Sequence, residues 1–326
     1  RKERSITMSK AVTAAQAARL LLEANDILIL THQYPDGDTL GSGYALCRAL
    51  LRAGRRARVA CADPIPEKYD YMLDGLEEPD FEPAFICAVD VADPKLLGSL
   101  RRYEGSIRLC IDHHGSNVPY AEYLLLDAQS TATAMLVSDV IRELGVPVDK
   151  PIADWLYTGI ATDSGCFKYS NTTAATHRLA AELMDRGADY AAINRSMFDI
   201  KSRARVELER LALESMKFYL GGRCAVMVIT NDMVEVSGAK ENDMEGLAPL
   251  PRQIEGVWVG VTLRQKADGA FKVSVRTGTH ADASAICVKL GGGGHVCAAG
   301  CAMAGPAEDA IARILSVVAD TVEGIR

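Results

Sequence analysis

Four separate segments of the sequence present aspartate and histidine, residue types that bind divalent cations and transfer protons. The residues singled out are His32, Asp36, Asp38, Asp90, Asp112, His113, His114 and Asp163. Imidazole and carboxylate ligands without thiolates suit manganese, cobalt, iron or magnesium better than structural zinc. So many carboxylates would leave a large negative charge on one ion, whereas two metals ~3.5–4 Å apart are the usual clamp for phosphoryl hydrolysis. The residue types therefore predict a two-metal centre.

Each residue taken alone has a simpler explanation. Asp36 and Asp38 lie in a turn made tight by Pro35 and Gly37, where aspartate often serves only as a cap. The adjacent pair His113-His114 is harder to explain in this way, because the chain has only six histidines. Taken together, the four segments favour a functional cluster.

Alternating strands and helices must position these residues. Apolar runs predict strands at 26–31, 58–61, 85–89 and 107–111, and helical spacing predicts helices at 39–53, 131–144, 152–162 and 176–186. This alternation predicts an α/β domain, with a mostly parallel sheet covered by helices on both faces. Three of the four segments follow predicted strands, and sites in such sheets form outside the carboxyl ends of the strands.

The rest of the chain has a different pattern. A polar stretch at 190–219 has helical spacing and contains the basic run 201–205, and we expect one connecting helix there. Strands at 224–229, 257–264, 271–276 and 296–303, with helices at 283–290 and 307–322, predict a smaller α+β domain. The expected organisation is a catalytic domain at 1–190, a connecting helix at 191–220 and a substrate-binding domain at 221–326.

Composition limits the classes of function. The net charge of −7 over 326 residues argues against binding long duplex nucleic acid. Aromatic residues make up 6% and do not alternate with the basic runs, which favours a short substrate. No apolar run approaches the ~18 residues of a membrane span, and residues 1–10 lack the apolar core of a signal peptide. We therefore expect a cytoplasmic protein that does not bind membranes.

A glycine run near the C-terminus is the second candidate site. Successive N–H groups of Gly291–Gly294 can form an anion nest. Such a run is more often a flexible turn, but His295 directly after it and Arg276 on the preceding hairpin could also pair with a phosphate.

The order of these motifs resembles the DHH phosphoesterase superfamily. The pattern His32-x-x-x-Asp36-x-Asp38, then Asp90, then Asp112-His113-His114, then Asp163, looks like its four motifs. The segment from Gly291 to His295, followed by Ala298-Ala299-Gly300, looks like the DHH-associated C-terminal domain. The resemblance covers nearly the whole chain. The length of the chain is most similar to that of the branch whose members shorten very small RNAs and dephosphorylate 3′-phosphoadenosine 5′-phosphate.

The resemblance implies two manganese ions. One is held by His32 and Asp36, the other by Asp38, His113 and Asp163, and Asp90 bridges both. It also implies that Asp112 orients the histidines, as ligating imidazoles usually require. His114 would face either the substrate phosphate or the leaving oxygen, and both roles stay open.

For the second domain, the resemblance implies substrate contacts from the glycine loop and the nearby arginine. The residues concerned are Gly292, Gly293, Gly294, His295 and Arg276. We expect them to hold a terminal phosphate.

The expected activity is Mn²⁺-dependent hydrolysis of short oligoribonucleotides and 3′-phosphoadenosine 5′-phosphate by a hydroxide that bridges the metals. One alternative is a phosphodiesterase for cyclic or linear dinucleotides, which would use the same site. Another is a non-catalytic nucleotide-binding module. The partners are therefore short RNA or small phosphorylated nucleotides, and a homodimer is kept as an alternative to a monomer.

Overall fold

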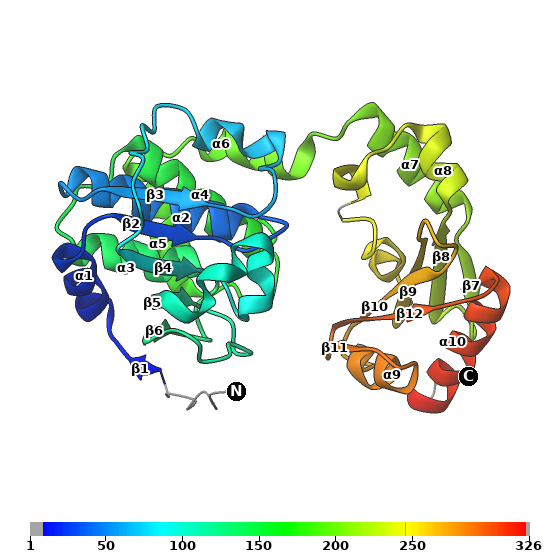
Figure 1. Cartoon of the computed structure of the whole chain (residues 1–326). Coiled ribbons are helices and arrows are strands. Elements are labelled where there is room, and N and C mark those ends of the chain that lie inside the picture. Colours follow the sequence, from blue (N-terminus) through cyan, green and yellow to red (C-terminus); the bar gives the residue numbers. More distant parts are fainter. Residues whose placement is uncertain (1–8, 245, 324–326) are drawn as a thin grey trace. The chain divides into compact units, whose positions relative to one another are not determined.

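The computed structural model describes residues 9–244 and 246–323, and it divides into two compact units, residues 1–200 and 201–326 (Figure 1). Each unit has a sheet and a hydrophobic core of its own. Within the described ranges, no helix has the length and apolar character that a membrane span requires.

The first unit is an α/β fold around a six-stranded sheet. Its strands are β1 (Lys10–Ala11), β2 (Ile27–Leu30), β3 (Ala57–Ala60), β4 (Phe85–Val89), β5 (Ile107–Asp112) and β6 (Tyr123–Leu126). Its α-helices are α1 (Ala14–Glu23), α2 (Gly37–Arg52), α3 (Thr133–Glu143), α4 (Lys150–Asp163), α5 (Ala174–Asp185) and α6 (Tyr190–Asn194). The 3₁₀ segments η1 (Glu67–Met72) and η2 (Pro94–Ser106) and the π-turn η3 (Arg195–Asp199) complete it.

All strand pairs of this sheet are parallel, in the order β1-β6-β5-β4-β2-β3. The chain continues from β2 to β3 on one side and then returns to place β4 on the other side of β2. The strand order therefore reverses between β2 and β4, and such a reversal opens a crevice at the carboxyl ends of the strands.

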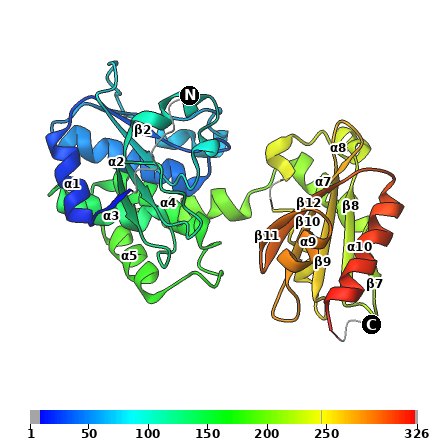
Figure 2. The same ribbon diagram turned by 60° about the horizontal axis from the view of Figure 1, so that its bottom comes forward.

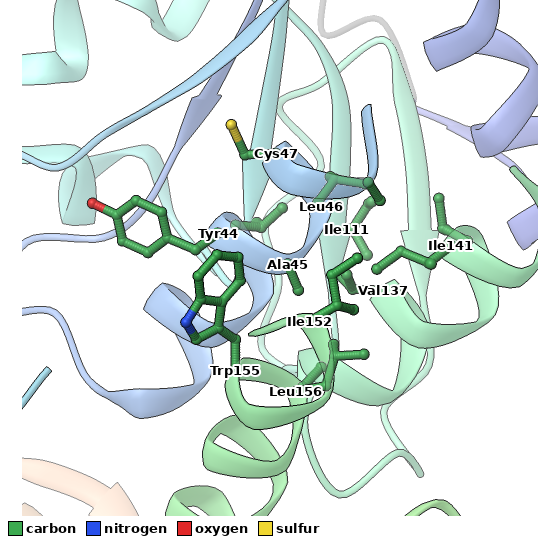
Figure 3. Packing of buried hydrophobic residues seen from close by; sticks show 14 of the residues in the cluster. Tyr44, Ala45, Leu46, Cys47, Ile111, Val137, Ile141, Ile152, Trp155 and Leu156 are labelled. Carbon is green, nitrogen blue, oxygen red and sulfur yellow. The ribbon is translucent and has the colours of Figure 1, made fainter. Parts of the chain in front are cut away.

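Both faces of the central strands are covered, which explains why β2 and β4 are apolar throughout. On one face, α1 to α4 pack onto side chains such as Ile29 and Ile111. Figure 3 shows Trp155, Leu156 and Ile152 of α4 within this cluster. On the other face, η2 contributes Leu97 and Leu100 to a smaller cluster.

The second unit is a mixed sheet with helices, as expected for the smaller domain. Its strands are β7 (Lys217–Tyr219), β8 (Cys224–Ile229), β9 (Val259–Gln265), β10 (Phe271–Thr277), β11 (Gly293–His295) and β12 (Ala298–Met303), in the order β11-β12-β10-β9-β8-β7. Its helices are α7 (Arg203–Glu214), α8 (Asn231–Ser237), η4 (Glu241–Met244), η5 (Leu250–Gln253), α9 (Ala283–Lys289) and α10 (Ala307–Thr321). Only β8 and β9 are parallel neighbours.

Helices cover the second sheet unequally. The helices α9 and α10 pack on one face (Figure 2), where Ile286 and Ile314 join the side chains of β9 and β10. On the opposite face, α7 packs over β8 through Leu208 and Met227. The β10 row Lys272, Ser274 and Arg276 stays partly or fully exposed.

Two elements differ from the sequence-based expectation. The single helix expected at 190–219 is broken, because Ile200 adopts an extended backbone and the Ser202 hydroxyl accepts the Arg205 N–H to start a new helix, α7. The helix expected from Thr131 begins at Thr133 instead. The hydroxyl of Thr131 donates to the carbonyl of Asn171 at 2.7 Å and does not cap this helix.

Other elements lie outside every sequence-based expectation. The helix α1 has a capping box between Thr13 and Gln16, a signal visible in the sequence. The strand β1 has only two residues and is a strand because it pairs with β6, whereas β6 is the apolar run Tyr-Leu-Leu-Leu, a second signal visible in the sequence.

Candidate functional site

The cluster lies at the carboxyl ends of β2, β4 and β5, beside the reversal of strand order. His32 follows β2, Asp90 follows β4, and Asp112 ends β5 directly before His113 and His114. Because these strands are parallel neighbours, their ends meet at one edge of the sheet. The fold thus brings together residues that are far apart in the sequence.

Asp36 is both a helix cap and a member of the cluster. Its Oδ1 accepts the N–H groups of Asp38 and Thr39, at 3.0 and 3.1 Å, and so starts α2. Its Oδ2 lies 3.6 Å from Nε2 of His32. Asp36 therefore caps α2 with one oxygen and presents the other to His32.

The first donor group consists of His32, Asp36 and Asp90, whose ligand atoms lie within 4.8 Å of one another. Nε2 of His32 is 3.5 Å from Oδ2 of Asp90. Nδ1 of His32 lies 2.8 Å from the carbonyl of Gln33. A backbone acceptor of this kind favours a proton on Nδ1 and leaves the Nε2 lone pair for a cation.

The second donor group consists of Asp38, His113 and Asp163. Nε2 of His113 lies 3.5 Å from Oδ2 of Asp163 and 3.9 Å from Oδ2 of Asp38. Nδ1 of His113 lies 3.1 Å from the carbonyl of Ser130. The imidazole is therefore held in the same manner as that of His32, with Nε2 toward the carboxylates.

Asp90 lies between the two groups. Its Oδ2 faces His32, and its Oδ1 lies 3.8 Å from Nε2 of His113. The residue is 2% exposed and has a φ of 59°, a left-handed conformation that costs free energy for a non-glycine residue. The hydroxyl of Thr133 donates to Oδ1 at 2.8 Å and fixes the carboxylate.

The N-terminus of α3 holds the other buried carboxylate. The N–H groups of Thr133 and Ala134 donate to Oδ2 and Oδ1 of Asp38, at 2.7 and 2.9 Å. The hydroxyl of Ser42 lies 3.3 Å from the same Oδ1. Helix N-termini stabilise negative charge. Sequence reasoning missed Thr133, because it placed the start of this helix two residues too early.

His114 is oriented by Asp112, whereas His113 is not. Oδ1 of Asp112 lies 2.7 Å from Nδ1 of His114 and accepts the backbone N–H of His113 at 2.9 Å. Asn117, which the sequence did not point to, donates to Oδ2 at 2.6 Å. The hydrogen bond to Asp112 raises the pKa of His114 to about 9. The side chain of His114 is 41% exposed, so a substrate can reach it.

The electrostatics of the cluster favour cations. Burial lowers the pKa of His32, but Asp36 and Asp90 outweigh burial and raise it to about 11. Burial and the charge of Asp90 raise the pKa of Asp38 well above its usual range. Burial also raises the pKa of Asp163 to about 7. Crowded carboxylates in such a site hold protons that divalent cations can replace.

The donor set fits divalent metal ions. It offers carboxylate oxygens and imidazole nitrogens in two groups, and Asn117 and Thr133 donate hydrogen bonds to the carboxylates of Asp112 and Asp90 from outside these groups. A third overlapping group joins Asp90 and His113 to His114. The arrangement can hold two cations, one on each side of Asp90. Such a pair of cations suits the hydrolysis of phosphoryl groups.

Arg276 and His295 lie in the second unit, in one row across its sheet. Arg276 of β10 pairs with Ala298 of β12, and Ala298 pairs with His295 of β11. Directly paired residues of antiparallel strands place their side chains on the same face. The row thus presents an arginine and a histidine on one face, with the small Ala298 between them.

Most glycines of the run 291–294 are required by the backbone conformation or by packing. Gly291 has a φ of 82° and ends α9. A Cβ on Gly292 would lie 2.2 Å from the carbonyl of Gly300, and one on Gly294 would lie 2.6 Å from Cα of Ala299, so β12 packs against both. A Cβ on Gly293 would meet nothing within 4 Å. Gly293 is therefore a position of the run where neither packing nor a left-handed backbone conformation requires glycine.

Three residues outside the cluster have structural roles. The hydroxyl of Thr173 caps α5 by accepting the N–H of Thr176. His177 stacks on Phe167, with ring centroids 5.1 Å apart. In the basic run 201–205, Lys201 pairs with Glu209 at 2.8 Å, a solvated ion pair rather than a free cation.

Two known protein domains match the sequence. The DHH family, N-terminal domain, matches residues 26–160. The DHHA1 domain matches residues 223–324. The first match covers β2 to β6, and the second covers β8 to β12.

Two curated proteins are similar over most of the chain. The bifunctional oligoribonuclease and PAP phosphatase NrnA of Thermus thermophilus is 36% identical over 299 residues, which are 90% of this chain and 89% of the relative. A probable bifunctional oligoribonuclease and PAP phosphatase of Streptococcus mutans is 24% identical over 292 residues, 89% of this chain and 93% of the relative.

Among solved structures, an exopolyphosphatase-related protein from Bacteroides fragilis has a similar fold. Its TM-score is 0.85 at 24% identity, and the match covers 94% of this chain and 96% of the other. At this identity the likeness shows the fold.

Proposed function

The chain belongs to the DHH/DHHA1 family of phosphoesterases, and we propose that it hydrolyses short oligoribonucleotides and 3′-phosphoadenosine 5′-phosphate. The observation that carries this proposal is the pair of donor groups that share Asp90. The curated relatives named for both activities, one of them as probable, support the choice of substrates.

We assign His32 and Asp36 to one cation, Asp38, His113 and Asp163 to the other, and Asp90 to both. Two Mn²⁺ ions bound there would supply Lewis acidity toward the phosphoryl oxygens and lower the pKa of water. The hydroxyl of Thr133 donates to one oxygen of Asp90 and fixes this carboxylate between the two donor groups. The peptide N–H groups that bind Asp38 keep that carboxylate in place before any substrate arrives.

His114 is the residue that we expect to touch the substrate. Asp112 accepts from Nδ1 of His114 and thereby fixes the orientation of the ring. The exposed part of the ring can then donate to a phosphoryl oxygen or to the leaving oxygen. A hydrogen bond made at that point would favour departure of the alcohol.

The second unit supplies further phosphate contacts in this proposal. Arg276 can bind a phosphate with two parallel hydrogen bonds, and His295 shares its row. The N–H groups of Gly291 and Gly292 already donate to the carbonyls of Val288 and Cys287, whereas the open space beside Gly293 lets an anion approach the backbone there.

A substrate panel under Mn²⁺ tests the proposal. It compares the dinucleotide pApA, 3′-phosphoadenosine 5′-phosphate, a cyclic dinucleotide and pyrophosphate, each with metal and with a chelator. We expect turnover of the first two in Mn²⁺ alone. Turnover of the cyclic dinucleotide or of pyrophosphate that is faster than turnover of both pApA and 3′-phosphoadenosine 5′-phosphate would contradict the substrate assignment. It would favour the alternative phosphodiesterase or a pyrophosphatase.

A further inference from the structure

A stack of three side chains in the second unit has no part in the contacts described above. The rings of Trp258 and His280 lie 4.6 Å apart, at an angle of 23°. The guanidinium carbon of Arg223 lies 4.0 Å from the centroid of the Trp258 ring. Stacked rings beside a cation are the arrangement that proteins use to bind nucleobases.

The strand register places this stack at the end of the sheet that carries Arg276. Arg223 and Trp258 directly precede paired residues at the starts of β8 and β9. The strand β10 runs in the opposite direction and ends there with Thr277, which pairs with Val259. His280 follows three residues later, and Arg276 directly precedes Thr277.

His280 is the accessible layer of the stack. It is exposed, whereas Trp258 and Arg223 are partly buried. One face of the imidazole lies against Trp258, so the opposite face is the one available to a ligand. A single accessible ring accommodates one base.

The same end of the sheet has a further cation. Arg252 of η5 packs closely against the backbone after β10. A Cβ on Gly278 would lie only 2.1 Å from Nη2 of Arg252. Its buried Nε has no hydrogen-bond partner. Among the described residues, neither Arg252 nor Arg223 forms an ion pair. The corner thus combines an aromatic surface with positive charge, which complements a nucleotide.

We propose that the exposed ring of His280, supported by Trp258, stacks on a nucleobase of the substrate whose phosphate Arg276 and His295 hold. This inference rests on the proposed function, and it identifies how the base is bound. Stacking tolerates any base because every base has a π-face. One stacked base and one bound phosphate describe a short substrate rather than a long strand.

Two stable probes separate base binding from phosphate binding. Adenosine 5′-monophosphate carries both a base and a phosphate, and ribose 5-phosphate carries the phosphate alone. We expect the full chain to bind the nucleotide more tightly, measured by calorimetry. His280→Ala should weaken nucleotide binding about tenfold and leave ribose 5-phosphate unaffected, whereas His280→Phe should keep the preference for the nucleotide.

Fluorescence gives a second readout. Trp258 is one of only two tryptophans, and the other, Trp155, is 1% exposed in the core of the first unit. Nucleotide binding should change the emission, and Trp258→Phe should remove that change. Phe218→Ala is the matched control, because Phe218 is an exposed aromatic residue on β7 at the far edge of the same sheet.

The outcomes distinguish this inference from the proposed function. Equal nucleotide affinity in wild type and His280→Ala, or no preference of the wild type for the nucleotide, overturns the stacking proposal alone. Unchanged affinity for both probes in Arg276→Ala overturns the phosphate assignment in the proposed function. Failure of the wild type to bind either probe overturns both.

Discussion

At the scale of single residues, Asp90 is the carboxylate that contacts histidines of both donor groups. Its two oxygens face His32 and His113, and it occupies a strained left-handed backbone conformation. Strain of this kind persists only where the surroundings fix it, and it is common at functional sites. The bond from Thr133 is one of the contacts that fix it.

Replacing the shared carboxylate should remove activity without unfolding the protein. We predict that Asp90→Ala lowers Mn²⁺-dependent turnover by about a thousandfold or more, because both cations lose a ligand. Asp139→Ala, which alters an exposed carboxylate of the same unit, is the control. Turnover of Asp90→Ala near the wild-type rate, with circular dichroism unchanged, would contradict the two-metal assignment.

The adjacent histidines should separate in function. We predict that His113→Ala loses one of the two bound Mn²⁺ ions, since Nε2 of His113 faces the carboxylates of Asp38 and Asp163. His114→Ala should keep both ions and lose rate, because Asp112 already holds its Nδ1. Metal analysis of the two purified variants measures this. Equal metal content in both variants would show that His113 is not a ligand.

At the scale of elements, the start of α3 is a supporting structure for the site. Two of its first N–H groups bind Asp38, and the Thr133 side chain binds Asp90. A helix N-terminus can do this because its first N–H groups have no partner within the helix. One element thereby positions carboxylates from two other segments.

The hydroxyl of Thr133 should tune metal affinity. We predict that Thr133→Val, which keeps the shape and removes the donor, weakens Mn²⁺ binding about 10- to 100-fold. Thr133→Ser restores the hydroxyl and should return affinity toward the wild-type value. Titration of Mn²⁺ by calorimetry measures both variants, and unchanged affinity in Thr133→Val would remove Thr133 from the supporting role.

The glycine loop should divide into structural and open positions. We predict that Gly294→Ala destabilises the second unit by more than about 1 kcal/mol, because Gly294 has a φ of 147° and packs on Ala299. Gly293→Ala should keep the wild-type Tm, since an added Cβ meets nothing within 4 Å, and should raise KM for a phosphorylated substrate. Thermal unfolding with both variants tests this, and equal Tm values would contradict the packing argument.

At the scale of the whole molecule, the chain divides its residues between two units with separate cores. The first unit carries the carboxylates and imidazoles of the metal cluster, and the second carries the row with Arg276. This division predicts that metal binding and phosphate binding respond to different substitutions.

Loss of Arg276 should weaken substrate binding and leave the metals in place. We predict that Arg276→Ala lowers kcat/KM about 10- to 100-fold, mainly through KM, for substrates with a free terminal phosphate. A bis-aryl phosphodiester, which lacks that phosphate, should be much less affected. Bound Mn²⁺ should match wild type. Equal losses on both substrates would mean that Arg276 supports the fold or the chemistry instead.

Much of the fold follows from local pattern. The strands β4 and β8 have the predicted bounds, because buried strands of Val, Ile and Cys are uninterrupted apolar runs. The break in the helix at Ile200 was not predicted, because the helical spacing of apolar residues continues across it. The start of α7 depends on a single cap, the side chain of Ser202. The strand β6 was missed although its residues Tyr-Leu-Leu-Leu form a short apolar run, the signal that predicts the other buried strands of this sheet.

The sequence alone determined which residue types could form the site, because cation chemistry requires carboxylates and imidazoles and their motifs are local. Only the tertiary structure decided how they are held. The contacts of Ser130 with His113 and of Thr133 with Asp90 join segments that are far apart in the chain, and they depend on how α3 packs against the sheet. The same is true of the row from Arg276 to His295, which exists only through strand register. The register between β10 and β12 pairs residues that are far apart in the chain, and the spacing of residues within either strand does not give it.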